Sequence, residues 1–192
     1  MDQVHGTAVV MAHAGRPDAS TADAHGRLGA VRAGSGDALV SADPTVAVAV
    51  LTADCAPIAL GSEEGVFAAV HAGWRGLDAG VVESAVRAMR SLGATRVAGA
   101  LGPCIHAGCY EFSDADLAGV VARHGPSVRA RTADGRPALD LPAAVSSALA
   151  SCGVREVPGV DACTACAGGY FSHRARGDRG RQALVVWSGG SG

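Results

Sequence analysis

Short apolar runs separated by polar, glycine-containing turns predict a set of β-strands in the middle and at the end of the chain. Residues 46–51 form a continuous valine-rich run, which predicts a buried strand, and further strands are expected over 67–70 and 97–101. Residues 183–187 predict the last strand. The polar segment 61–65 is bounded by glycines and lies between two apolar runs, so we expect a hairpin with a short loop there.

Three segments have apolar residues at helical spacing and carry helix start and stop signals. The first spans 79–92 and is followed by a glycine. The second spans 113–124, where Ser113 is a suitable N-cap and a Gly-Pro pair follows the last turn. The third spans 141–152, with Asp140 as its cap and a proline in its first turn.

The mixture of elements favours an α+β fold over a doubly wound sheet, because strands and helices do not follow a strict βαβ repeat. The chain has 192 residues, which is enough for one domain with its own core. No linker divides it, so we expect a single domain over 1–192. Residues 14–35 and 129–137 are polar and rich in glycine, alanine and arginine, and we expect them to be loops.

The charge and hydropathy of the chain argue against several classes of partner. The formal net charge is −2, whereas a broad nucleic-acid-binding surface would be basic. No apolar run approaches the length of a membrane span, and no signal-peptide pattern precedes the expected elements. We therefore expect a cytoplasmic protein that binds neither nucleic acid nor membranes.

Two histidines and one cysteine from three separate segments are the strongest indication of chemistry. They are His5 near the N-terminus, Cys55 after the first predicted strand, and His71 after the strand expected over 67–70. Two imidazoles and one thiolate can hold a tetrahedral metal ion and leave its fourth position open, which is the ligand set of a catalytic site. Each residue also has an ordinary alternative, since a single cysteine or histidine beside an apolar strand is often packed in the core.

The spacing of Cys55 and His71 supports a shared site. If the hairpin loop centres on Glu63, these two residues lie directly opposite each other, and opposed Cβ atoms on one sheet face are about 4.5–5.5 Å apart. A register shift of one residue would remove this pairing. After His71, glycines break the strand and place Trp74 beside Arg75, which indicates a functional loop.

The remaining cysteines give weaker indications. Cys163 and Cys166 form a C-x-x-C, but neither a thioredoxin-like βαβ context nor a second cysteine pair accompanies it, so we expect neither a redox motif nor a zinc knuckle. Cys104 and Cys109 flank a turn and are expected to be buried thiols near the site. A disulfide framework is not expected in a chain of this size and apolar composition.

Several strings in order along the chain resemble the laccase-domain family, also called multicopper polyphenol oxidase-like or YfiH-type proteins. The matching strings are Gln3-Val4-His5-Gly6, Asp37-Ala38-Leu39-Val40, Thr52-Ala53-Asp54-Cys55-Ala56-Pro57, His71-Ala72-Gly73-Trp74-Arg75-Gly76, Leu101-Gly102-Pro103-Cys104-Ile105, Cys109-Tyr110-Glu111, Asp161-Ala162-Cys163-Thr164, Tyr170-Phe171-Ser172-His173-Arg174 and the tail from Gly180-Arg181-Gln182 to Trp187.

The resemblance implies a layered α/β/β/α arrangement and a zinc-dependent purine nucleoside phosphorylase with adenosine deaminase activity. It also implies that His5, Cys55 and His71 are the metal ligands, the same three residues that the ligand argument selects. Members of this family carry tens of residues before the Gln-Val-His-Gly string, including a segment near the active site. We therefore expect residues 1–192 to form one catalytic domain without this usual N-terminal segment.

Substrate contacts are predicted from side-chain chemistry. Arg75, Arg174 and Arg181 are candidates for phosphate or ribose contacts, because a guanidinium pairs with phosphate oxygens through two hydrogen bonds; the alternative is that they are solvated surface arginines. Gln3 and Tyr110 are further candidates. Trp74 and Tyr110 have the flat faces needed to stack on a purine, or are part of the core.

Alternative functions stay open at the level of sequence. A copper-dependent polyphenol oxidase agrees with the older family name, although three ligands hold a single metal ion. A cysteine hydrolase would use Cys55 and His71 as a nucleophile–base dyad. A role in editing peptidoglycan precursors is implied by the family resemblance alone. The leading hypothesis is the zinc enzyme, with a purine nucleoside and phosphate as its substrates.

Overall fold

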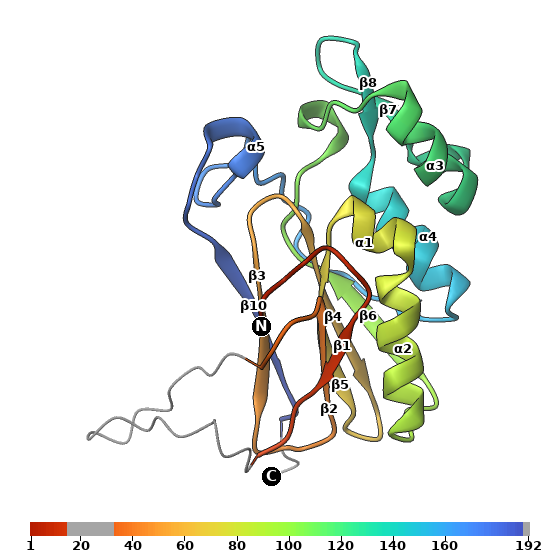
Figure 1. The fold of residues 1–192 in the computed structure, drawn as a ribbon, viewed down its shortest axis with the longest axis vertical. Helices are drawn as coiled ribbons and strands as arrows, with labels where there is room; N and C mark the ends of the chain where they lie inside the picture. The colour runs from red at the N-terminus through yellow and green to blue at the C-terminus, as the bar shows by residue number, and fades with distance from the viewer. Residues whose placement is uncertain (15–32, 190–192) are drawn as a thin grey trace.

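The computed structural model describes residues 1–14 and 33–189, and it is built around a six-stranded mixed sheet (Figure 1). Along the sheet the strands are β1 (Val9–Met11), β2 (Ala38–Ser41), β5 (Phe67–Ala72), β4 (Ala56–Ser62), β6 (Val97–Leu101) and β9 (Arg155–Glu156). The outer pairs β1–β2 and β6–β9 are parallel, and the inner pairs are antiparallel. The strands expected over 67–70 and 97–101 are confirmed.

Helices cover one face of this sheet (Figure 1). They are α1 (Trp74–Ala79), α2 (Val81–Ser91) and α4 (Leu141–Ser151), with α3 (Asp114–His124) packed against α1 and α4. Alternate residues of the sheet point into this layer, including Val40, Ile58 and Val70, which are fully buried. The larger of the two hydrophobic cores therefore lies between the sheet and these helices.

A two-stranded antiparallel sheet of β3 (Ala47–Thr52) and β10 (Gln182–Trp187) packs on the opposite face. The second core fills the space between the two sheets, with Leu39 and Phe67 from the large sheet and Val48 and Val50 from β3. Both predicted strands are confirmed, but complete burial of the first was wrong. Alternate residues of β3 point away from this core, and Leu51 is 52% exposed.

Local signals located the helices well and missed one break. Ser113 accepts a hydrogen bond from the Asp116 amide, and Asp140 accepts one from the Ala143 amide, as their capping roles require. The helix expected over 79–92 begins at Val81, because Gly80 adopts a left-handed conformation (φ +97°). The segment before it, expected to be a loop, forms α1 instead.

The remaining elements are short. They are η1 (Ala107–Cys109), η2 (Pro126–Val128), β7 (Arg129–Arg131), β8 (Pro137–Leu139) and α5 (His173–Arg176). The β7–β8 hairpin spans residues 129–139. The loop expected over 129–137 was therefore wrong at both ends, where the backbone forms paired strands. Most of the loop expected over 14–35 lies outside the described residues.

The mixed α+β class is confirmed, with helices on one face of the large sheet and the β3–β10 pair on the other. Among the described residues, every helix is too short or too polar to cross a membrane. The space between the two sheets is the part of the fold that matters for chemistry. His71 follows Phe67 and Ala69 on the face of β5 that points into this space.

Candidate metal centre

His5, Cys55 and His71 converge at one end of the space between the sheets. One donor atom from each residue can be chosen so that all three lie within 4.8 Å of one another. The Cys55 Sγ lies 3.6 Å from the His5 Nε2, and the His5 and His71 rings meet edge to face with their centroids 4.9 Å apart. His71 is buried, Cys55 is half-buried and His5 is exposed, so the group opens toward solvent on the His5 side.

The hairpin that brings Cys55 and His71 together has a different register from the one expected. The Ser62 amide bonds to the Val66 carbonyl, and Gly65 takes a left-handed conformation (φ +80°), so the loop centres on Glu64 instead of Glu63. Pro57, not Cys55, therefore lies opposite His71. The direct pairing of the two ligands was wrong.

The two side chains still share one face because the register differs by an even number of positions. Extending the ladder by one pair beyond the end of β5 places Cys55 opposite Gly73, and His71 is two residues before Gly73 in the chain. Residues two apart on a strand point to the same side of a sheet, and diagonal neighbours remain within reach of long side chains. The ligands thus meet diagonally across the sheet.

Gly73 makes room for this group. A Cβ atom at this position would lie 2.7 Å from the His5 Cδ2 and 3.2 Å from the Cys55 Sγ. The Gly73 backbone has ordinary angles (φ −74°, ψ 162°), so conformational freedom does not explain the glycine. A glycine is needed here because any Cβ atom would collide with His5 and crowd Cys55, two of the three candidate ligands.

Asp37 organises two of the three ligands at once. This fully buried carboxylate lies 2.8 Å from the His71 Nδ1 through Oδ1, and it accepts hydrogen bonds from the backbone amides of His5 (3.0 Å) and Gly6 (2.7 Å). A carboxylate on Nδ1 makes this nitrogen the protonated one, which leaves Nε2 of His71 free to bind a metal ion. The sequence predicted no role for Asp37. The feature that could have identified it is its position as an acidic residue directly before a buried strand.

The N-terminal segment is also held by Gln3. Its Nε2 donates to the Leu51 carbonyl (2.7 Å), and its Oε1 accepts from the Leu51 amide (2.9 Å). His5, two residues later, has a left-handed backbone (φ +59°), which is uncommon for a residue with a side chain. The bonds of Gln3 and Asp37 hold the backbone on both sides of this turn. A contact between Gln3 and substrate stays a prediction.

Asp54 holds the turn that presents Cys55. It is buried, has a left-handed backbone (φ +87°), and its Oδ1 accepts hydrogen bonds from the hydroxyls of Thr164 (2.8 Å) and Ser172 (2.6 Å). Its Oδ2 accepts the Arg174 amide (2.7 Å). Asp54 directly precedes Cys55 in the sequence, but its distant partners could not be identified from spacing.

The electrostatics favour the neutral forms of Cys55 and His71. Burial raises the pKa of Cys55 to about 11, and the neighbouring Asp54 adds to this while Arg181 opposes it. Burial also lowers the pKa of His71, against the effect of its hydrogen bond to Asp37. A neutral imidazole is ready to bind a metal ion. A thiol with a raised pKa is a poor nucleophile on its own, which disfavours the cysteine dyad.

The predicted substrate residues gather in two stacked pairs and one separate arginine. The Arg75 guanidinium lies 4.5 Å from the centre of the Trp74 ring, and that of Arg174 lies 5.0 Å from the centre of the buried Tyr110 ring. Arg181 donates to backbone carbonyls of its own turn, and its charge acts on Cys55. One face of each aromatic ring is thus covered by an arginine. Whether these residues contact substrate remains a prediction.

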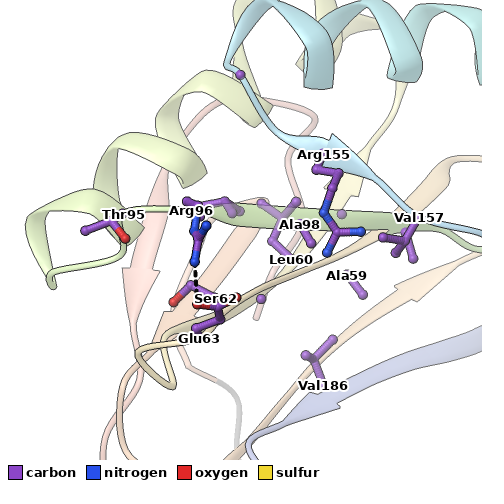
Figure 2. A pocket seen from close by; sticks show the side chains of 15 residues that line it. Ala59, Leu60, Ser62, Glu63, Thr95, Arg96, Ala98, Arg155, Val157 and Val186 are labelled. Carbon is purple, nitrogen blue, oxygen red and sulfur yellow. Dashed lines mark hydrogen bonds and ion pairs between the residues drawn. The ribbon is translucent and has the colours of Figure 1, made fainter.

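A hollow on the described part of the chain lies away from this group. Figure 2 shows it between β4, β6 and the segment after β9. Its volume is about 740 Å³. Its lining includes Leu60, Arg155, Val157 and Val186, and an exposed Arg96–Glu63 ion pair lies at one end. None of the three candidate ligands lines it, so we place the chemistry at the His5 group and not in this groove.

Comparison with known proteins gives one family over nearly the whole chain. Residues 1–189 match the family described as multi-copper polyphenol oxidoreductase laccase. Among curated relatives, the purine nucleoside phosphorylase SCO2081 of Streptomyces coelicolor is 43% identical over 154 residues, covering 79% of this chain and 63% of the relative. The purine nucleoside phosphorylase Cgl2154/cg2365 of Corynebacterium glutamicum is 34% identical over 190 residues, covering 97% and 72%.

Solved structures agree on the fold. Protein NMB0706 of Neisseria meningitidis, described as DUF152, superposes with a TM-score of 0.78 at 30% identity and covers 98% of this chain and 73% of its own. YlmD from Geobacillus stearothermophilus gives a TM-score of 0.79 at 28% identity, with 97% and 71% covered. The chain thus spans about two thirds to three quarters of these relatives, and 63% of the Streptomyces protein.

Proposed function

This chain belongs to the family described as multi-copper polyphenol oxidoreductase laccase, and we propose that it is a zinc-dependent purine nucleoside phosphorylase that also deaminates adenosine. The observation that carries the proposal is the open three-ligand group of His5, Cys55 and His71. The names of the relatives support the substrate class, since several are purine nucleoside phosphorylases.

The donor set fits zinc in both chemistry and spacing. Zinc in proteins binds imidazole nitrogen at about 2.0–2.1 Å and thiolate sulfur at about 2.3 Å, so neighbouring nitrogen and sulfur donors of a tetrahedral ion lie about 3.5 Å apart. The Cys55 Sγ and His5 Nε2 are 3.6 Å apart. Gly73 leaves space beside both atoms, and Asp37 supplies the carboxylate that commonly orients a metal-binding histidine.

Zinc at an open three-ligand site can polarise a substrate group or lower the pKa of a bound water. The protein's own residues have the remaining tasks. Asp37 fixes the ring orientation of His71, and Asp54 fixes the turn before Cys55. Arg75 and Arg174 supply positive charge for phosphate, and both are stacked on aromatic rings, which restrains their side chains.

Arg181 adds a third positive charge on the Cys55 side of the group, because its charge lowers the pKa of that thiol against the effects of burial and Asp54. We propose that Arg75, Arg174 and Arg181 together give the open site a local positive field, in a chain of net charge −2. This field favours the binding of an anion such as phosphate. A purine would lie beside the exposed part of Trp74, which is half-buried.

The proposal is tested by phosphate-dependent turnover of inosine and adenosine before and after chelation. We expect loss of both activities on removal of metal, recovery with Zn²⁺, and loss in Cys55→Ser. The matched control is Cys152→Ser, since Cys152 lies after α4, outside the group, and it should keep full activity. Recovery with copper alone, together with oxidation of phenols, would favour the polyphenol oxidase. Activity that survives complete removal of metal would favour the cysteine hydrolase.

A further inference from the structure

A second group of potential metal ligands, made of three cysteines, lies outside the His5 group. The Sγ atoms of Cys109, Cys163 and Cys166 all lie within 4.8 Å of one another. Cys109 ends η1, whereas Cys163 and Cys166 form the C-x-x-C in the loop before α5. Backbone pairing between Cys104 and Cys163 joins the two segments. The sequence lacked a second pair for the C-x-x-C, and the fold supplies a single third cysteine from a distant segment.

The surroundings of Cys163 favour a negative sulfur. Its Sγ accepts the backbone amide of His106 at 3.4 Å. Burial raises the pKa of this thiol, but hydrogen bonds from the backbone amides of His106, Cys166 and Ala165 outweigh burial, so the pKa is lowered overall. Burial raises the pKa of Cys109, and the neighbouring Cys163 raises it further. Three adjacent thiols cannot all lose their protons unless a cation neutralises them.

We propose that Cys109, Cys163 and Cys166 bind one thiophilic metal ion of the zinc class through three thiolates, in a second site separate from the His5 group. Each thiol releases its proton to solvent as its sulfur–metal bond forms. Sulfur atoms around a tetrahedral ion at about 2.3 Å lie about 3.8 Å apart, so the observed spacing needs only a small contraction. Cys166 is exposed, which leaves the fourth position to water or an external ligand.

The position of this site indicates a structural task. Thr164, between the two cysteines of the C-x-x-C, donates to the Asp54 carboxylate that holds the turn before Cys55. Cys109 directly precedes Tyr110, on which Arg174 is stacked. A metal ion here would therefore crosslink the loop that contains Cys109 and Tyr110 to the loop whose Thr164 binds Asp54. The cysteines act as positioning residues, and the inference does not depend on the reaction proposed for the His5 group.

The test is the metal content of the full chain, purified with reductant and without air, loaded with Zn²⁺ and measured by elemental mass spectrometry. Cys166→Ser removes an exposed ligand and should lose about one zinc per chain relative to wild type. Cys55→Ser should lose the other zinc, and the double variant should lose both. Cys152→Ser is the matched control and should keep the wild-type content. Circular dichroism checks that each variant is folded.

Cd²⁺ provides a second readout, because thiolate–cadmium bonds absorb in the ultraviolet in proportion to the number of thiolates. Most of this absorption should disappear in Cys166→Ser and Cys109→Ser and persist in Cys55→Ser. Equal zinc content and equal absorption in wild type and Cys166→Ser would overturn the proposal. A disulfide between Cys163 and Cys166 in the reductant-purified protein, with no zinc uptake there, would overturn it as well. Failure of the His5 group instead appears as an unchanged metal content in Cys55→Ser.

Discussion

Gly73→Ala should disturb the geometry of the His5 group without straining the backbone of the fold. The new Cβ would lie 2.7 Å from the His5 Cδ2, whereas carbon atoms in favourable contact are about 3.5–4.0 Å apart, so the His5 ring must move by about 1 Å. Since the Gly73 backbone has ordinary angles, alanine adds no backbone strain there. A displacement of about 1 Å at a site can cost about 100-fold in function, so we expect zinc affinity to fall by about 10- to 100-fold.

The measurement is zinc competition against a chromophoric chelator, together with the thermal midpoint of the metal-free protein. The matched control is Gly119→Ala on the exposed face of α3, where a Cβ meets nothing within 4 Å. Alanine there should raise stability by about 0.5–1 kcal/mol and leave zinc affinity unchanged. Wild-type affinity in a folded Gly73→Ala protein would refute the reasoning, because His5 could then not be a ligand in the position described.

Three further predictions follow from the surrounding residues. Asp37→Asn should weaken zinc binding by about 10- to 100-fold, because the carboxylate that orients His71 is lost; an unchanged affinity by the same competition assay would contradict this. The metal-free protein should lose stability as pH falls below about 6.5, because burial lowers the pKa of His71 and the folded state binds its proton less readily than the unfolded state. The free energy of unfolding, measured with denaturant, should depend less on pH in His71→Gln than in wild type. Identical pH profiles in the two proteins would contradict this prediction. Asp54→Asn should lower the free energy of unfolding by about 1–3 kcal/mol in denaturant experiments, because the amide NH₂ would face hydrogen-bond donors. The control Asp161→Asn changes an exposed side chain and should change the free energy of unfolding little.

The features that the sequence predicted well depend on neighbouring residues. Ser113 and Asp140 cap their helices through residues three positions away, so the local sequence contains the whole interaction. The choice of His5, Cys55 and His71 as candidate ligands followed from residue chemistry, and the structure brings these three residues together. By contrast, the loop register depended on which residue near Gly65 adopts a positive φ, and the composition of the turn allowed more than one choice.

The features that the sequence missed depend on residues far apart in the chain. The carboxylate of Asp37 meets His5 and His71 across strands, and Asp54 meets Thr164 and Ser172 from the C-terminal half. No short-range spacing in the sequence identifies the partners of Asp37 or of Asp54. The third cysteine beside the C-x-x-C also comes from a distant segment, and backbone pairing of Cys104 with Cys163 brings the two loops side by side.

These distant contacts make His5 and His71 interdependent. Asp37 binds the ring of His71 and the backbone of His5 through one carboxylate, so a change that displaces either histidine also disturbs the support of the other. The effects of Asp37→Asn and a His5 variant on zinc affinity should therefore not add, since both act through the same group of contacts. The turn before Cys55 depends on a different carboxylate with its own partners. Asp54 and Asp37 variants should consequently be closer to additive, which separates the two supports of the site.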